Sequence, residues 1–334
     1  MQKMPTLPVF DLHCDLLSYL RELPDADPAG QEDIGASLPY LQQGNVKLQV
    51  MAIYTDVEPG STFRAQEQIM HYQHLLRDYN DYLQNISSAA DLESVTSGNK
   101  IGTIVAIENA AGLCEPNEPV LRAVERLNDY VEKCGAIAYI GITHHTANRF
   151  GGGNMSDLGL TNDGKALLDN LDGRGIAVDL SHTSDALAEG IFEHLSKSNL
   201  NVPVIASHSN FRKVWNHARN LPDEFVQEII ARKGLIGMNF LRAYVNNNSP
   251  EALLDHIEYG IANGAEDCLA MGADFFYTKN HPDASRRPFY FTEHENAATY
   301  PAILQQLKQR GLKNKQLKKI AFENALHFFG NQLS

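Results

Sequence analysis

Eight short apolar runs rich in β-branched residues recur along this chain of 334 residues, and segments with helical spacing separate most of them. Such alternation is typical of repeated βα units, in which each helix returns the chain to the start of the next parallel strand. An open doubly wound sheet usually stops at about five or six strands, whereas eight can close into a barrel. The sequence therefore predicts an α/β fold, a (β/α)8 TIM-type barrel.

The expected strands are Pro8–Asp15, Val46–Thr55, Lys100–Asn109, Gly135–Thr143, Ile176–His182, Pro203–Ser209, Gly234–Leu241 and Cys268–Phe275. Helical spacing marks Thr62–Leu83, Glu118–Lys133, Thr161–Arg174, Ser184–Ser196, Pro222–Lys233 and Pro250–Asn263. Pro301–Phe329 is expected to add one or two C-terminal helices. No linker or low-complexity tract divides the chain, and α/β barrels reach this size, so residues 1–334 are predicted to form a single domain.

Composition narrows the class of protein. Hydrophobic residues make up 43% of the chain and charged residues 21%, as in globular proteins with a sizeable core. The formal net charge of −13 would repel phosphate backbones, so nucleic acid is not an expected partner. No stretch is apolar enough to span a bilayer, and Met1–Phe10 lacks the apolar run of a signal peptide. We therefore expect no membrane association and a cytoplasmic location.

Two smaller features exclude other chemistries. The four cysteines (Cys14, Cys114, Cys134, Cys268) are far apart, which indicates buried, reduced thiols and not a disulfide framework or a thiolate zinc site. Gly151-Gly152-Gly153 follows the expected fourth strand but lacks the lysine and the helix of a phosphate loop. We expect it to be a flexible loop.

Residues that commonly bind metals close four of the expected strands, at the end of a barrel where active sites lie. His13 and Asp15 close the first strand, and strand alternation points both to the same side. The alternative for this pair is a helix-capping aspartate beside a hydrogen-bonded histidine. Glu108 closes the third strand, where a buried, ionised carboxylate needs a cation or hydrogen-bond donors.

His182 and His208 close the fifth and sixth strands. A single buried histidine is more often a hydrogen-bonded core residue, but imidazoles together with carboxylates are the ligands of zinc sites. Five such residues exceed the three that one catalytic zinc normally takes from the protein. The number favours two metals that share Glu108, roughly 3.5–4 Å apart, with a hydroxide between them.

The chain resembles the renal, or membrane, dipeptidase family of zinc peptidases over most of its length. The motifs that carry the resemblance are Asp11-Leu-His13-Cys-Asp15, Thr143-His144, Gly159-Leu-Thr161-Asn-Asp-Gly164, Asp179-Leu-Ser-His182 and Ser207-His208-Ser209 followed by Ala218-Arg219-Asn-Leu-Pro-Asp223. The resemblance implies two Zn²⁺ ions, with His13 and Asp15 on one, His182 and His208 on the other, and Glu108 bridging. It also implies a dipeptide substrate and a homodimer.

Three further roles follow from the resemblance, each with an alternative. His144, not its neighbour His145, would donate to the scissile carbonyl oxygen; the alternative of a loop histidine suits His145 better. Arg219 would bind the free carboxylate of the dipeptide, unless it caps a helix or forms a surface ion pair. Asp274 would be the acid/base group, unless it only caps a short helix.

The chain also departs from the family pattern at two places. It has Asp274-Phe-Phe-Tyr277 where related chains often have Asp-Phe-Asp-Gly, and Asn239-Phe-Leu241 lacks the second aromatic residue expected on the seventh strand. These changes leave the proposed chemistry intact. They affect the shape of the pocket, so the resemblance does not fix which side chains the enzyme prefers.

The expected reaction is hydrolysis of a dipeptide by a metal-bridged hydroxide. Asp274 would take the proton and deliver it to the leaving amine. The first alternative is another binuclear hydrolase acting on lactones or cyclic amides; such enzymes typically carry H-x-H on the first strand and often a metal-bridging lysine. The second is a catalytically silent barrel that binds peptides or metal. Histidine and carboxylate ligands also admit manganese, cobalt or iron.

Overall fold

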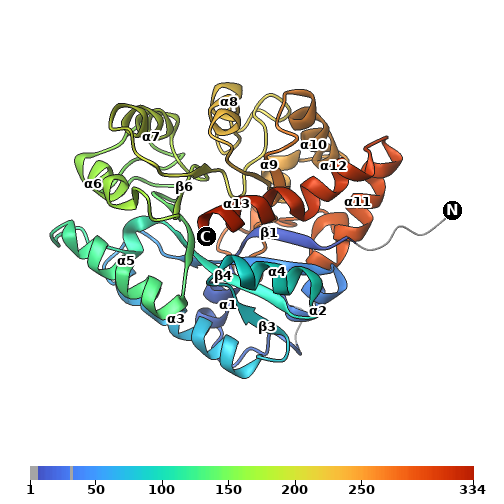
Figure 1. Ribbon diagram of the computed structural model, residues 1–334, viewed down its shortest axis with the longest axis horizontal. Helices are drawn as coiled ribbons and strands as arrows, with labels where there is room; N and C mark the ends of the chain where they lie inside the picture. Colours follow the sequence, from blue (N-terminus) through green and yellow to red (C-terminus); the bar gives the residue numbers. More distant parts are fainter. Residues whose placement is uncertain (1–6, 31–32) are drawn as a thin grey trace.

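The computed structural model describes residues 7–30 and 33–334; part of the N-terminal stretch examined for a signal peptide therefore lies outside the described residues. The strands all pair in parallel (Figure 1). They are β1 (Val9–Cys14), β2 (Val46–Tyr54), β3 (Leu83–Asn85), β4 (Ile101–Glu108), β5 (Ile137–Gly141), β6 (Ala177–Asp179), β7 (Val204–Ile205), β8 (Ile236–Met238) and β9 (Leu269–Met271).

The sheet closes on itself. Its order is β7-β6-β5-β4-β2-β1-β9-β8, and a parallel bridge between Ala206 and Ile236 joins the two outer strands. β3 stands outside this ring and pairs with the start of β4. The predicted (β/α)8 TIM-type barrel with additional C-terminal helices is thus confirmed, and each of the eight expected segments contributes a strand to it.

Helices connect and cover the strands, and each of the six segments with helical spacing overlaps one. Four shorter helices (16–22, 38–43, 89–97 and 242–245) were not predicted, and the C-terminal stretch forms three helices where one or two were expected. They are α1 (Leu16–Glu22), α2 (Leu38–Gln43), α3 (Ser61–Asp78), α4 (Ala89–Ser97), α5 (Leu121–Cys134), α6 (Asn162–Leu171), α7 (Asp185–Lys197), α8 (Asp223–Ala231), α9 (Arg242–Val245), α10 (Ala252–Ala262), α11 (Tyr300–Gln309), α12 (Asn314–Lys318) and α13 (Asn324–Gln332). A π-helical turn, Lys319–Glu323, joins α12 to α13.

Two details of the sheet differ from the expectation. β3 was not predicted, because its three residues are too few for an alternating pattern, and the expected helix Thr62–Leu83 ends earlier, at Asp78. The later strands are also shorter than expected. β6 stops at Asp179 because its side chain accepts the backbone N–H groups of Ser181 and Ser207, at 3.0 and 2.7 Å, and the chain then turns out of the sheet.

The end of the barrel where the strands begin is closed by α4 and α13, which cross in front of the strands in Figure 1. A compact apolar cluster there joins Phe10 and Ile104 of the strands to Val95 of α4 and Phe329 of α13. Asn324 fixes α13 to the sheet by donating to the backbone oxygens of Glu266 and Leu269. This end is therefore a packed core, and the site described below lies at the other end.

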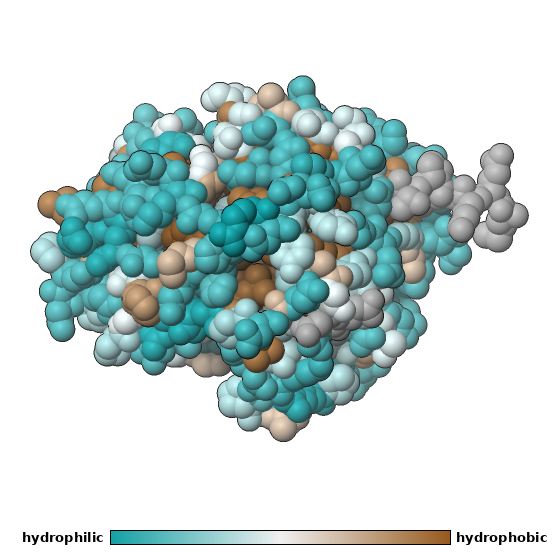
Figure 2. All heavy atoms as spheres, turned by 90° about the horizontal axis from the view of Figure 1, so that it is seen from below, coloured by the Kyte–Doolittle hydropathy of each residue, from teal (hydrophilic) through white to brown (hydrophobic). Residues whose placement is uncertain are grey.

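The surface and the cysteines agree with the composition. The face in Figure 2 is mainly hydrophilic, with its apolar side chains in small separate groups, which is normal for a globular protein. None of the helices in the described ranges is both long and apolar enough to cross a membrane. All four cysteines are free and buried, as predicted.

The glycine triplet after β5 was expected to form a flexible loop, but backbone hydrogen bonds hold it in place. Ser184 donates its backbone N–H to Gly152 O at 2.8 Å, and Gly153 bridges to Thr183. A Cβ on Gly153 would lie 2.1 Å from the backbone oxygen of His144. The glycines are therefore needed because the backbone packs closely against that of His144 and His145, where a side chain would not fit.

Candidate metal centre and active site

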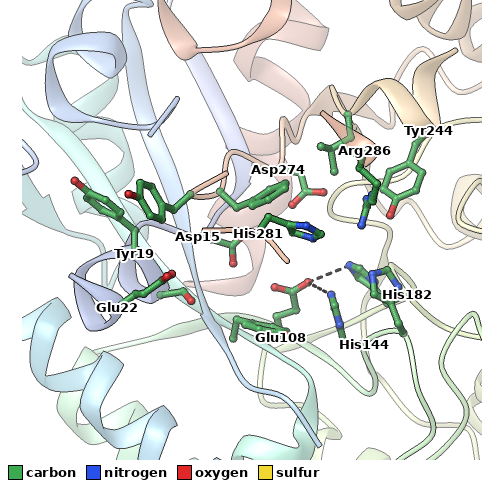
Figure 3. A pocket seen from close by; sticks show the side chains of 16 residues that line it. Asp15, Tyr19, Glu22, Glu108, His144, His182, Tyr244, Asp274, His281 and Arg286 are labelled. Carbon is green, nitrogen blue, oxygen red and sulfur yellow. Dashed lines mark ion pairs between the residues drawn. The ribbon is translucent and has the colours of Figure 1, made fainter. Parts of the chain in front are cut away.

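A pocket of about 190 Å³ opens at the carboxyl ends of the strands. Asp15, Glu108, His144, His182 and Asp274 contribute to its walls (Figure 3). Small-molecule sites usually measure roughly 300–1,000 Å³, so this pocket suits a small ligand better than a long peptide. Sequence-predicted residues from five different parts of the chain thus meet in one place.

Glu108 stands at the centre of the pocket floor, with its two carboxylate oxygens directed at different partners. Its Oε2 lies 3.4 Å from Nε2 of His13. Its Oε1 lies 3.0 Å from Nε2 of His182 and 3.8 Å from Nε2 of His208. Two groups of possible metal ligands share Glu108, namely His13–Asp15–Glu108 and Glu108–His182–His208. Two further groups at the same floor are His13–His208–Asp274 and His144–His145–His182.

The first group lies at the end of β1. Asp11 pairs with Gln49 and Cys14 with Met51, so β1 has one more residue than β2 across this stretch. A bulge of this kind changes the direction of side chains next to a site. Asp15 is at the N-cap of α1 but makes no capping hydrogen bond, and its Oδ2 lies 3.8 Å from His13 Nε2. The capping alternative for Asp15 is therefore wrong.

The second group holds two imidazoles with their Nε2 atoms only 2.9 Å apart. His182 lies beyond the end of β6, at φ +70°, a left-handed conformation that is rare outside glycine. Burial, with the nearby charge of Arg219, holds the pKa values of both His182 and His208 well below the usual range. Without a metal, Nε2–H of a neutral His182 can donate to Nε2 of His208, and a cation held by both rings would take the place of that proton.

Hydrogen bonds behind the histidines fix which nitrogen faces the pocket. The hydroxyl of Tyr139 donates to Leu12 O at 2.8 Å, so it accepts from Nδ1 of His13, 2.7 Å away. Ser207 likewise donates to Asp179 and accepts from Nδ1 of His208 at 2.7 Å. In both cases Nε2 is left with a free lone pair directed at Glu108, which is the arrangement that metal-binding histidines require.

The buried carboxylates on the pocket floor also favour the binding of a cation. Burial and the charge of Glu108 raise the pKa of Asp15 well above its usual range. Burial acts to lower the pKa of His13, but Glu108, Asp15 and Asp274 together outweigh it and raise the value to about 10. The buried carboxylates thus draw positive charge to His13 Nε2, which has no hydrogen-bond partner. A divalent metal would supply that charge, so the residues fit a metal centre.

Asp274 faces the same floor from the segment after β9. Its Oδ1 lies 3.8 Å from His13 Nε2, and its Oδ2 accepts from the side chain of Asn239 at 2.8 Å. Burial and the charge of Glu108 raise its pKa to about 6, although the charge of His13 opposes them. Its φ of +64° is a second strained conformation at the site. Asn239, two residues before the departure from the family pattern at Leu241, is therefore the residue that orients Asp274.

His144 and His145 both line the pocket, so the sequence-based choice between them is not decided by position. His144 Nε2 lies 3.8 Å from Glu108 Oε1, and its ring packs 4.1 Å from that of His182. Burial lowers the pKa of His144 to about 3, which keeps the ring neutral. His145 instead bonds through Nδ1 to Asn154 at 2.9 Å. Within the described ranges His144 has ring contacts with Tyr54, His145 and His182 but no side-chain hydrogen bond.

Arg219 is 3% exposed and lies against the ring of Tyr244, at 5.3 Å from its centre. Its two terminal nitrogens donate to Ser209 Oγ and to the backbone oxygen of His208, at 3.1 and 3.3 Å. Its Nε has no partner, and within the described ranges it forms no ion pair. The surface ion-pair alternative is therefore wrong. Tyr244 lines the pocket and Arg219 lies directly behind it.

Sequence reasoning did not identify the residues at the mouth of the pocket. They are Ser18, Tyr19 and Glu22 of α1, Tyr244 of α9, and Phe276, Tyr277, His281 and Arg286 of the segment between β9 and α11. The departures at residues 275–277 and at Leu241 were the available signals, because Phe276, Tyr277 and Leu241 all line the pocket.

Three comparisons place the chain among known proteins. A sequence model of the membrane dipeptidase family, peptidase family M19, matches residues 2–333. A dipeptidase of Aspergillus oryzae, aclJ, is 25% identical over 314 residues; the match covers 88% of this chain and 69% of that protein. The solved metallopeptidase called dipeptidase AC has a TM-score of 0.85 at 20% identity, covering 98% of this chain and 99% of that one.

A second solved structure is a metallopeptidase from Rhodobacter sphaeroides, bound to a phosphinate mimic of the dipeptide L-Ala-D-Ala. Its TM-score is 0.84 at 20% identity, and the superposition covers 99% of this chain and all of that one. At this level of identity the two solved structures show a common fold. The match to the family model, which extends over nearly the whole chain, is the stronger result.

Proposed function

Because the chain belongs to the membrane dipeptidase family and is therefore a metal-dependent dipeptidase, we propose that it cleaves dipeptides with a free C-terminal carboxylate at two zinc ions that share Glu108. The observation that carries this proposal is that the two carboxylate oxygens of Glu108 point at different residues. Oε2 faces His13 and Oε1 faces His182. The dipeptide mimic bound by the Rhodobacter sphaeroides protein supports the substrate class.

His13 and Asp15 would hold one ion, and His182 and His208 the other, with Glu108 between them. When bound, the ions would activate water and polarise the scissile carbonyl, as zinc does in hydrolases. Neutral imidazoles and carboxylates are the ligands that such sites use, and Tyr139 and Ser207 already hold two of the rings in the required tautomer.

Asp274 is proposed as the group that moves the proton. It reaches the floor beside His13, and Asn239 holds one of its oxygens so that the other stays free. As a base it would accept the proton of the attacking water, and as an acid it would return that proton to the leaving amine. Its burial keeps bulk water from competing for the proton.

His144 and Arg219 are proposed to hold the substrate. A neutral His144 can donate to the carbonyl oxygen as negative charge develops there. Arg219 lies beside the floor, at the backbone of His208, with a guanidinium that no carboxylate of the described residues satisfies. A planar guanidinium suits the α-carboxylate of a dipeptide. Cytoplasmic location and homodimer formation stay predictions.

The test combines a chelator with a panel of substrates. Removal of the metal should abolish hydrolysis of Ala-Ala, and Zn²⁺ should restore it in proportion to bound metal. Ala-Ala amide should be a poor substrate, because it lacks the carboxylate next to the scissile bond. Ala-Ala-Ala presents that carboxylate at its second peptide bond, so it should be poor only because a pocket of about 190 Å³ leaves little room for a third residue. Equal cleavage of the free and amidated dipeptides would contradict the carboxylate requirement and indicate a general amidase.

A further inference from the structure

The mouth of the pocket carries opposite charges at its two ends. Tyr19 and Glu22 lie at one end, Tyr244 and Arg286 at the other, and the carboxylates of the floor lie between them (Figure 3). Glu22 accepts from Asn280 at 2.8 Å and forms no ion pair within the described residues. A dipeptide lying across the floor would therefore meet a different charge at each end.

The proposed function sets the direction in which the dipeptide lies, and the inference rests on it. Arg219 lies behind Tyr244 and hydrogen-bonds the backbone of His208, so it is at the level of the floor and at the Tyr244 end. The α-carboxylate is close to the scissile bond and must remain near the floor. The C-terminal residue therefore lies at the Tyr244 end, and its side chain has to extend toward the mouth.

Arg286 lies at that end of the mouth, on the segment between β9 and α11. Its guanidinium packs over Phe289 at 5.4 Å, and it makes no ion pair within the part of the chain that the structure describes. Asp283, three residues earlier, is instead hydrogen-bonded to the backbone and hydroxyl of Ser285. Arg286 is thus a partly buried cation with unused donors, separate from Arg219.

We propose that Arg286 binds an acidic side chain on the C-terminal residue of the substrate, so that the enzyme prefers dipeptides ending in aspartate or glutamate. The two arginines would bind different carboxylates at different depths of the pocket. Arg219 would bind the α-carboxylate at the floor, and Arg286 would bind the side-chain carboxylate at the mouth. The dipeptide then bridges two guanidiniums that otherwise have no carboxylate partner. Arginine can bind such a carboxylate through two parallel hydrogen bonds.

The test compares Ala-Glu with Ala-Gln, which has nearly the same shape without the charge. The wild-type enzyme should favour Ala-Glu in kcat/KM by roughly 10- to 100-fold, the range expected of a hydrogen bond between charged groups. In Arg286→Met the ratio should fall toward one, mainly through KM. In Arg286→Glu the preference should reverse, with Ala-Lys cleaved better than Ala-Glu. Added salt should weaken the wild-type preference, because the pair is only partly buried.

Arg287→Met is the matched control, because it removes the same charge one residue away. Arg287 donates to the backbone oxygens of Thr278 and Lys279 and does not line the pocket, so this variant should keep the wild-type ratio. Loss of the ratio in Arg287→Met would mean that the segment merely changed shape and would contradict the proposal.

Three other results would overturn the proposal in distinguishable ways. Equal cleavage of Ala-Glu and Ala-Gln by the wild type would refute the acidic subsite but leave the dipeptidase function in place. Arg286→Met that loses both substrates equally would assign the α-carboxylate to Arg286. Failure of the wild type, loaded with zinc, to cleave any dipeptide would contradict the proposed function itself.

Discussion

The two ends of the barrel use the same strands for opposite purposes. At the carboxyl ends, buried positions hold charged or titratable groups such as Glu108 and His13, which are 5% and 0% exposed. At the other end, equally buried positions hold Phe10, Ile104 and Phe329. The difference shows that one end can be specialised for chemistry because the other supplies the packing, as in barrels generally.

Backbone conformation does not distinguish the two ends in the same way. Asn109, His182 and Asp274 have a positive φ at the carboxyl end, but Asn45, Asn199 and Lys233 also have one and lie in the turns that precede β2, β7 and β8. Conformations of this kind cost of order 1–3 kcal/mol each and persist only where surrounding contacts impose them. The ends differ in the groups that they bury, so substitutions at the two ends should affect different quantities.

The largest effect is expected from Asp274→Asn, which keeps the shape and removes the base. kcat should fall by about 10²- to 10⁴-fold, the range for a positioned acid/base group, with little change in stability. kcat and metal content should be measured on one sample, because loss of metal would imitate loss of the base. Asp169→Asn, at an exposed aspartate paired with His194, is the control. Near-normal kcat with full metal content would refute the assignment.

At the other end, Phe329→Ala should have the opposite effect, lowering stability and leaving kcat unchanged. Truncating a buried phenylalanine costs about 3–5 kcal/mol in the free energy of unfolding, because it leaves a cavity. Urea denaturation measures this loss, and kcat per folded molecule should not change. Phe328→Ala, at the partly buried neighbouring residue, should lower the free energy of unfolding by less. A large fall in kcat of folded Phe329→Ala would show that the two ends are not independent.

Arg219→Met should lower kcat/KM for free dipeptides by roughly 100-fold, since it removes a hydrogen-bonded charge at the proposed carboxylate site. Cleavage of the amidated dipeptide, already poor, should not decline further. This comparison separates a binding role from misfolding, which would reduce both. If both substrates lose activity equally, Arg219 supports the structure and does not select the carboxylate.

The smallest effect is expected from Tyr139→Phe, which removes the hydroxyl behind His13 and nothing else. Partners of this kind typically contribute about 10- to 100-fold in metal affinity. The measurement is a zinc titration against a competing chelator. Tyr130→Phe is the matched control, because its hydroxyl is also buried and donates to Gly112 O but lies outside the site. Equal affinities in the two variants would show that Tyr139 does not position His13.

The fold and the pocket floor could be predicted because they depend on periodicity. An apolar run that ends in His, Asp or Glu fixes both the strand and the place of its last side chain. Glu108 therefore lies where the sequence placed it, and His13, Asp15 and His208 join it. His182 and His208 reach this group although their strands end three residues earlier, at Asp179 and Ile205.

The mouth of the pocket could not be predicted in this way. Arg286 and His281 belong to a segment with no regular period, so only the folded chain shows which way they face. The hydrogen bond from His13 to Tyr139 joins strands that are not neighbours in the sheet, and no sequence pattern relates them. The role of Asn239 also became clear only from its contact with Asp274 in the folded chain.

The most direct test of the central claim is a zinc titration of the metal-free protein and of Glu108→Gln, with bound metal counted per chain. The wild type should bind two ions, and Glu108→Gln should weaken both together, because one carboxylate is shared between His13 on one side and His182 on the other. One ion per wild-type chain would contradict this account, and so would two ions bound by Glu108→Gln with undiminished affinity.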